Sequence, residues 1–166
     1  MRSPLAAVLL AVAFTVSDAH AQLRVGTVAP EVDLQTLGGK RFQLSALKGR
    51  PVVITFWGTW CPPCREEFPE LAEVYRKHHA GGLEVVAVNQ RDQELNTNAV
   101  QKFVDEFSAP FTIVLDTKGR SRRAYRLIGL PTTVFIDTAG VIATVVSGPV
   151  SREQLAMGLS TIGVKR

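Results

Sequence analysis

Cysteine is scarce in this 166-residue sequence, which contains only Cys61 and Cys64, separated by two prolines. So few cysteines argue against a four-thiolate zinc site, because the chain does not offer the other ligands. They also argue against a fold that depends on disulfides, since a bridge closing so short a loop removes little entropy from the unfolded chain. The length suffices for one domain with a hydrophobic core of its own. We therefore interpret the cysteine pair as chemically reactive.

A strong excess of charge is also absent, because the net charge is only +4 at pH 7. The basic residues are densest on a short predicted helix, where we expect a solvated face rather than a phosphate-binding stripe. They are Lys118, Arg120, Arg122, Arg123 and Arg126. We therefore expect no binding to nucleic acid. Repeats and low-complexity segments are absent too, which excludes a repeat architecture.

Long hydrophobic runs are missing except near the N-terminus, where residues 5–16 are apolar. This run is too short for a membrane-spanning helix. Ala19 and Ala21 supply the small residues of a signal-peptide cleavage site. We therefore predict a secretory signal peptide over residues 1–21 and a mature domain over residues 22–166. An uncleaved membrane anchor is the alternative, and no cysteine follows the run as a lipoprotein would require.

The two cysteines lie where a predicted strand is followed by a predicted helix. Residues 52–56 form an apolar, β-branched run, which is typical of a buried parallel strand. Helical periodicity follows Pro62 and Pro63. A helix N-terminus presents unpaired N–H groups and the positive end of the helix dipole, and both favour a thiolate over a thiol. Because the thiolate is the reactive form, this position predicts a dithiol that closes to a disulfide and opens again.

The rest of the hydrophobic pattern predicts alternating helices and strands. A Gly-Gly turn at residues 38–39 between alternating apolar residues predicts an N-terminal β-hairpin. Strand, helix and strand around the cysteines form a right-handed parallel unit. We expect Thr97 to cap the second helix and Ser151 to cap the last one. The other predicted elements are strands over residues 83–88 and 111–115, a short helix over residues 121–127, and a hairpin over residues 132–147.

Two motifs carry a resemblance to a known family. The run Trp57-Gly58-Thr59-Trp60-Cys61-Pro62-Pro63-Cys64 resembles the active-site motif of the thioredoxin superfamily. The run Gly129-Leu130-Pro131-Thr132-Thr133 is similar to the segment that carries its cis-proline. The resemblance extends from about residue 28 to the C-terminus. It points to the exported thiol:disulfide oxidoreductases of the TlpA/ResA/CcmG branch, which serve cytochrome c maturation.

This resemblance implies an α/β fold of the thioredoxin-like kind. We expect a three-layer α/β/α sandwich with a mixed sheet and an N-terminal β-hairpin. Between Cys61 and Pro131 the chain is longer than a plain thioredoxin, which predicts an extra helix-strand unit between the second parallel strand and the cis-proline.

The resemblance assigns different roles to the two cysteines. Cys61, at the exposed tip of the motif, is expected to be the attacking nucleophile, and Cys64, turned into the helix, the resolving thiol. Attack on a substrate disulfide forms a mixed disulfide, which Cys64 then resolves. Pro62 and Pro63 lack N–H groups, so we expect weaker stabilisation of the Cys61 thiolate than in a strong oxidant, which favours a reductant.

Deprotonation of Cys64 needs a nearby base. Plain thioredoxins use a buried aspartate in the strand, six residues before the first cysteine, where this chain has Thr55. Glu67 is the expected replacement, because it follows Cys64 by three residues and the exported reductases have a glutamate at that offset. Partial burial would raise the pKa of its carboxyl group toward the range of a working proton acceptor. We interpret Glu66 as a solvated glutamate at the helix N-terminus.

Substrate contacts are implied at Trp60, Leu130 and Pro131. A cis proline packed against the disulfide leaves the Leu130 backbone free for strand-like pairing with a substrate peptide. Trp57 and Trp60 would shield the sulfurs and offer contact surface, although either can equally be a core residue.

The sequence therefore predicts an exported, monomeric disulfide reductase without a metal or other cofactor. Its expected partners are protein disulfides such as apocytochrome c and a membrane electron donor of the DsbD/CcdA type, in the periplasm. A disulfide oxidant of the same fold is one alternative. A copper metallochaperone is another, although it would usually have three residues between its cysteines and a distant histidine. A peroxidase would place a threonine and an arginine around a lone cysteine, and this chain shows neither pattern.

Overall fold

A mixed seven-stranded sheet organises the computed structural model, which describes residues 23–165. The strand order is β2-β1-β5-β4-β3-β6-β7, with β3, β4 and β5 parallel and the other pairs antiparallel. The strands are β1 (Asp33–Thr36), β2 (Arg41–Gln43), β3 (Val52–Trp57), β4 (Glu84–Asn89), β5 (Thr112–Leu115), β6 (Thr132–Ile136) and β7 (Ile142–Ser147).

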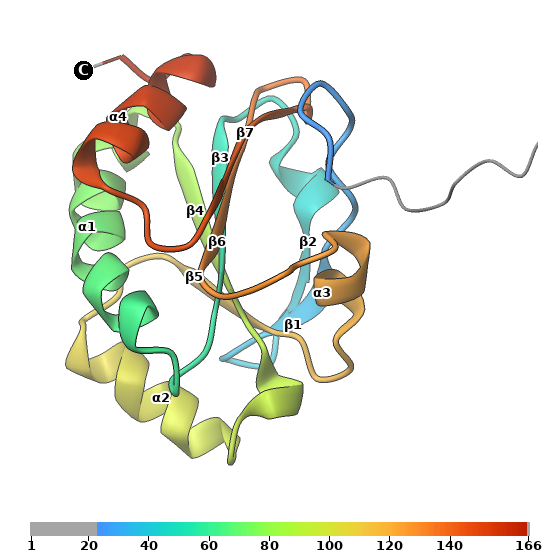
Figure 1. The fold of residues 1–166 in the computed structure, drawn as a ribbon, viewed down its shortest axis with the longest axis vertical. Coiled ribbons are helices and arrows are strands. Elements are labelled where there is room, and N and C mark those ends of the chain that lie inside the picture. The colour runs from blue at the N-terminus through green and yellow to red at the C-terminus, as the bar shows by residue number, and fades with distance from the viewer. Residues whose placement is uncertain (1–22, 166) are drawn as a thin grey trace, which may run out of the picture.

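Helices cover both faces of the sheet (Figure 1). One face carries α1 (Pro62–His78), α2 (Thr97–Glu106) and α4 (Arg152–Thr161), and the other carries the short α3 (Arg120–Ala124). Successive strand residues point to opposite faces, so the sheet contributes to two separate cores. The predicted three-layer α/β/α sandwich with a mixed sheet is confirmed, with the α3 layer thinner than the other.

The central strand β3 carries the chain to the cysteines. All six of its residues are buried, because it lies between β4 and β6 and both of its faces are covered. This explains why apolar residues follow one another along the strand instead of alternating with polar ones, with Thr55 as the one polar residue. Phe56 packs on Tyr125 beneath α3, and Trp57 packs on Phe68 and Phe103 of the opposite core.

The extra helix-strand unit predicted between the second parallel strand and the cis-proline is confirmed as α2 and β5. Strand β5 pairs in parallel with β4 and in antiparallel with β1, so it joins the N-terminal hairpin to the central sheet. The predicted cap of α2 is wrong. Asn96 caps this helix, because it takes an extended conformation and its side-chain oxygen accepts the Ala99 N–H at 2.9 Å. Thr97 is the first helical residue.

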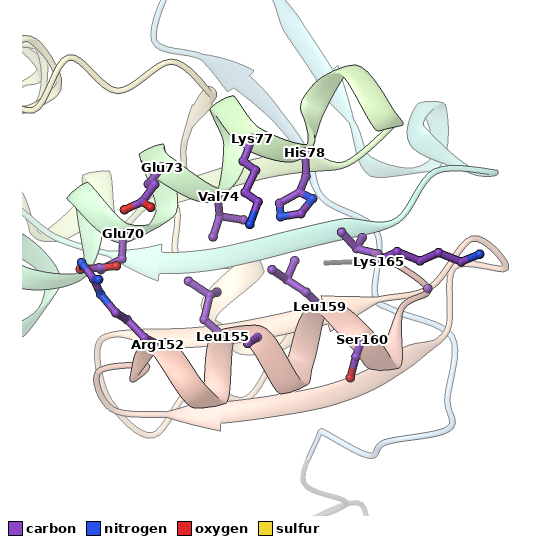
Figure 2. Close-up of a pocket in the computed structure, with 13 residues that line it drawn as sticks. Glu70, Glu73, Val74, Lys77, His78, Arg152, Leu155, Leu159, Ser160 and Lys165 are labelled. Carbon is purple, nitrogen blue, oxygen red and sulfur yellow. The ribbon is translucent and has the colours of Figure 1, made fainter.

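The closing helix α4 begins as predicted. Ser151 caps it in a reciprocal arrangement with Gln154, whose side chain accepts the Ser151 N–H. Helices α1 and α4 border a groove of about 560 Å³, bridged at one end by the Arg152–Glu70 ion pair at 2.7 Å (Figure 2). Neither cysteine lines this groove.

The predicted signal peptide, residues 1–21, lies outside the described residues. Within residues 23–165 no helix has both the length and the apolar character needed to cross a membrane.

Candidate active site

Cys61 and Cys64 form a disulfide at the N-terminus of α1. Cys61 is the cap residue of this helix, and Pro62 and Pro63 occupy its first two positions. The Cys64 N–H donates to the Cys61 sulfur at 3.3 Å. Because the prolines have no N–H, the Cys64 N–H is the one backbone donor to the Cys61 sulfur among the described residues. The sequence-based placement of the pair at a strand-to-helix junction is confirmed.

The expected exposure of Cys61 is wrong for the disulfide form. Cys61 is 3% exposed and Cys64 1% exposed, and both belong to the core cluster that includes Trp57 and Phe68. The bond to Cys64 draws the Cys61 sulfur onto the first turn of α1, and the partly buried Leu130 packs against the same cluster. The disulfide is therefore almost completely shielded from solvent in this form.

The two tryptophans of the motif separate into a core residue and a surface residue. Trp57 is fully buried. Trp60 is 51% exposed, and its indole lies so close over Gly58 that a Cβ there would be 2.9 Å from the ring. The absence of a side chain at Gly58 thus lets the indole lie against the loop before Cys61. Only Trp60 of the two is exposed, and its contact with a substrate stays a prediction.

A buried glutamate that the sequence analysis missed holds this loop. The Glu94 carboxylate accepts the Thr59 N–H at 2.7 Å, the Thr59 hydroxyl at 2.5 Å and the Asn89 side-chain amide at 2.8 Å. Parallel neighbouring strands end at the same edge of a sheet, so the residues after β4 lie beside those after β3. A carboxylate shortly after the second parallel strand was the signal that could have identified it.

Glu67 is more deeply buried than expected, with 2% exposure. Its carboxyl group accepts the Thr133 hydroxyl at 2.8 Å, the Thr55 hydroxyl at 3.1 Å and the Val150 N–H at 3.4 Å. Burial raises the pKa of Glu67, and the three hydrogen bonds offset part of that rise. The predicted direction of this pKa shift is therefore confirmed. Glu66 is exposed, as predicted.

Glu67, the expected replacement for the strand aspartate of plain thioredoxins, contacts the residue at that aspartate's position. Thr55 stands where plain thioredoxins have a strand aspartate, and the carboxyl group of Glu67 reaches its hydroxyl from α1. Thr133, which the sequence analysis did not single out beyond its motif, is the cross-strand partner of Thr55. The register of β3 against β6 brings both hydroxyls to the same carboxyl oxygen.

The Leu130–Pro131 peptide bond is cis, as the resemblance implied. Thr132, the next residue, is the register partner of Phe56, so Pro131 lies beside the end of β3, where the chain turns toward the cysteines. The Pro131 carbonyl accepts the Gly148 N–H at 2.9 Å, which fixes the segment on the β7 side.

Metal ligands are not gathered in the part of the chain that the structure describes, where no three His, Cys, Asp or Glu side chains could hold an ion. The arrangement at the end of α1 is instead suited to exchange between two thiols and a disulfide, with a buried carboxyl group close in sequence to Cys64. A cysteine pair at the start of a helix, beside a cis-proline in a thioredoxin-like fold, defines a thiol-disulfide oxidoreductase.

Comparison with known proteins agrees with this class. The model of the AhpC/TSA family matches residues 25–145. The thiol-disulfide oxidoreductase ResA of Bacillus subtilis is 39% identical over 130 residues, which cover 78% of this chain and 71% of that protein. The chain therefore belongs to the thioredoxin-like AhpC/TSA family, in the branch that contains ResA.

Solved structures give the same picture. A Chlorobium tepidum protein assigned as the thiol:disulfide interchange protein DsbE aligns with a TM-score of 0.77 at 33% identity. The alignment covers 86% of this chain and 100% of that one. A secreted Mycobacterium tuberculosis disulfide oxidoreductase homologous to Escherichia coli DsbE aligns with a TM-score of 0.69 at 29% identity, over 78% and 94% of the two chains.

Proposed function

We propose that this protein is an exported disulfide reductase, with Cys61 as nucleophile, Cys64 as resolving thiol and Glu67 as the base that accepts the Cys64 proton. The reducing direction is supported by the single N–H donor at the Cys61 sulfur. A strong oxidant stabilises its reduced form through its thiolate, and the two prolines withhold donors that would do so. The single backbone donor at the Cys61 sulfur is the observation that carries the proposed direction.

The proposed reaction exchanges one disulfide for another. The Cys61 thiolate attacks one sulfur of the substrate disulfide, and the other substrate sulfur leaves as a thiolate. Cys64 gives its proton to Glu67 and attacks the Cys61 sulfur of the mixed disulfide. The second substrate thiolate leaves, both substrate sulfurs take up protons, and the Cys61–Cys64 disulfide remains. The substrate gains the two electrons that the enzyme dithiol loses.

Substrate contact is proposed at the surfaces that border the disulfide. The half-exposed indole of Trp60 supplies an apolar contact on one side. The Leu130–Pro131 segment supplies backbone groups for strand-like pairing on the other. Such pairing is largely independent of substrate side chains, so the partner is an extended polypeptide that carries a disulfide.

The proposed location is the periplasm, after removal of residues 1–21. The secreted Mycobacterium tuberculosis relative and the relative assigned to DsbE support export. There the protein would reduce substrates such as apocytochrome c and be reduced again by a membrane electron donor of the DsbD/CcdA type. Mass spectrometry of the exported protein tests the location, with Gln22 expected at the mature N-terminus.

Trapping of substrates tests the roles of the cysteines. Cys64→Ser should accumulate a mixed disulfide between Cys61 and a protein substrate, because the resolving thiol is missing. Cys61→Ser should accumulate none. Trapping by Cys61→Ser instead would reverse the two roles.

The equilibrium reduction potential of the pair tests the direction. We expect a value of about −270 mV, as in reducing thioredoxins, whereas a value of about −120 mV would identify a disulfide oxidant of the same fold.

A further inference from the structure

The two oxygens of the Glu67 carboxyl group are held unequally. Oε1 accepts both threonine hydroxyls, from Thr133 at 2.8 Å and from Thr55 at 3.1 Å. Oε2 accepts only the Val150 N–H, at the long distance of 3.4 Å. Because Glu67 is 2% exposed, these three protein donors, among the described residues, set its hydrogen bonding. One oxygen is therefore saturated and the other is nearly free.

The sheet fixes the positions of the two hydroxyls. Thr55 and Thr133 are directly paired across β3 and β6, and both are at most 1% exposed. Each hydroxyl has one hydrogen to donate. The Thr133 oxygen lies 3.3 Å from the Thr55 oxygen but 2.8 Å from Glu67, so its hydrogen goes to the shorter contact. Both hydroxyls thus donate to the same carboxyl oxygen.

We propose that Thr55 and Thr133 are positioning residues that anchor Oε1 of Glu67 and leave Oε2 as the oxygen that takes the Cys64 proton. This inference rests on the proposed role of Glu67 as the base. In the step, the S–H bond of Cys64 breaks and an O–H bond forms at Oε2. Oε1 then becomes the carbonyl oxygen of the acid, which still has two lone pairs for the two hydroxyls. The carboxyl group can therefore accept and release the proton without losing its anchor.

No charged side chain in residues 23–165 is hydrogen-bonded to Glu67. On α1, Glu66 is exposed and Glu70 is paired at 2.7 Å with Arg152, at the start of α4. The strands β3 and β6 face Glu67 with the two uncharged threonines. Arg65 on α1 is paired with Glu106 of α2, and the remaining titratable group close in sequence on α1 is Cys64 itself. The threonine donors favour the carboxylate, so they lower a pKa that burial raises.

The test isolates the step in which Cys64 acts. Reduced enzyme reacts with dithiobis(nitrobenzoate), which releases one coloured thiolate when Cys61 attacks and a second when Cys64 attacks. The rate of the second release is measured against pH. Removal of one donor in Thr133→Val or Thr55→Val should move the acid limb of this profile upward by about one pH unit, because the carboxylate loses a hydrogen bond.

Two further variants separate positioning from a general effect on the fold. Thr133→Ser retains the hydroxyl and should restore the wild-type limb. Thr132→Val removes a neighbouring hydroxyl that points to the other face of the sheet and donates to the Gly129 carbonyl at 2.9 Å. Its acid limb should coincide with that of the wild type. A readout independent of activity is the ¹³C carboxyl titration of Glu67 in the disulfide form, which should shift upward in Thr133→Val.

The possible failures are distinguishable. If the Glu67 titration and the acid limb are the same in Thr133→Val and wild type while Glu67→Gln slows the second release, the positioning role is overturned and the base stands. If Glu67→Gln releases the second thiolate as fast as wild type from about pH 5 to pH 9, the proposed base is overturned. An unshifted carboxyl titration then also overturns the anchoring by the two threonines.

Discussion

The Glu94 carboxylate accepts two hydrogen bonds from Thr59, a residue 35 positions earlier in the chain. One of them comes from the backbone N–H of the loop that leads to Cys61, so a side chain after β4 fixes the main chain before the nucleophile. The same carboxylate also accepts the amide of Asn89 at 2.8 Å. A residue that follows the neighbouring strand β4 therefore helps to hold the active-site loop in place, together with the loop's own residues.

Replacement of Glu94 should loosen this loop. In Glu94→Ala the Thr59 N–H and the Asn89 amide lose their acceptor, and each donor left unpaired in a buried place costs about 1–3 kcal/mol. We expect a lower free energy of unfolding in urea and faster hydrogen exchange at the Thr59 N–H. Glu73→Ala, on the exposed face of α1, is the control and should stay within about 0.5 kcal/mol of wild type. Unchanged exchange at Thr59 would show that the loop holds its shape without Glu94.

The ionisation of Glu67 should make the disulfide form less stable as the pH rises. Burial raises the pKa of Glu67 in the folded protein above its unfolded value, so the folded state binds more protons between these two values. Unfolding then becomes easier as pH rises through this window, and the loss is complete above the folded-state pKa. Glu67→Gln cannot ionise and should lack this decline. Urea unfolding of both proteins from about pH 4 to pH 9 measures it, and parallel curves would contradict the prediction.

Helix α4 packs on the sheet through a glycine. A Cβ at Gly158 would lie 2.4 Å from the ring of Phe135, which is fully buried and cannot turn aside. Gly158→Ala should therefore destabilise the protein by about 1–3 kcal/mol despite the higher helix propensity of alanine. Gly81→Ala, where a Cβ meets nothing within 4 Å, is the matched control. A second change, Phe135→Leu, should recover part of the loss, and simple additivity in this double-mutant cycle would rule out the clash.

The exposed indole of Trp60 should matter for large substrates only. Trp60→Ala removes an apolar contact beside the disulfide, and loss of a central tryptophan contact costs about 2 kcal/mol, or about thirtyfold in kcat/KM. We expect this loss for a protein disulfide and little change for a small aromatic disulfide. Met157→Ala, which removes another exposed apolar side chain on α4, is the control. Equal losses on both substrates would place Trp60 in the chemistry rather than in recognition.

Sequence patterns predicted the elements well where the signal is local. The apolar run of β3, the prolines that start α1 and the cap at Ser151 depend on neighbouring residues, and all three are where the sequence predicted. The cap of α2 was predicted one residue late, at Thr97, because asparagine and threonine are both good caps and the sequence does not say which one takes the extended conformation. Local propensity thus fixed the elements but not every boundary.

The cysteine pair and its place at a helix N-terminus could be predicted from consecutive residues, and the cis-proline from the resemblance of its segment to that of the thioredoxin superfamily. The surroundings of these residues depend on the tertiary structure. Glu67 meets Thr133 across 66 positions through the register of β3 against β6, and Cys61 is buried because the core closes over the disulfide. Burial and hydrogen-bond partners are properties of packing between distant segments. They set the pKa of a carboxyl group and the access to a sulfur, and no local pattern encodes them.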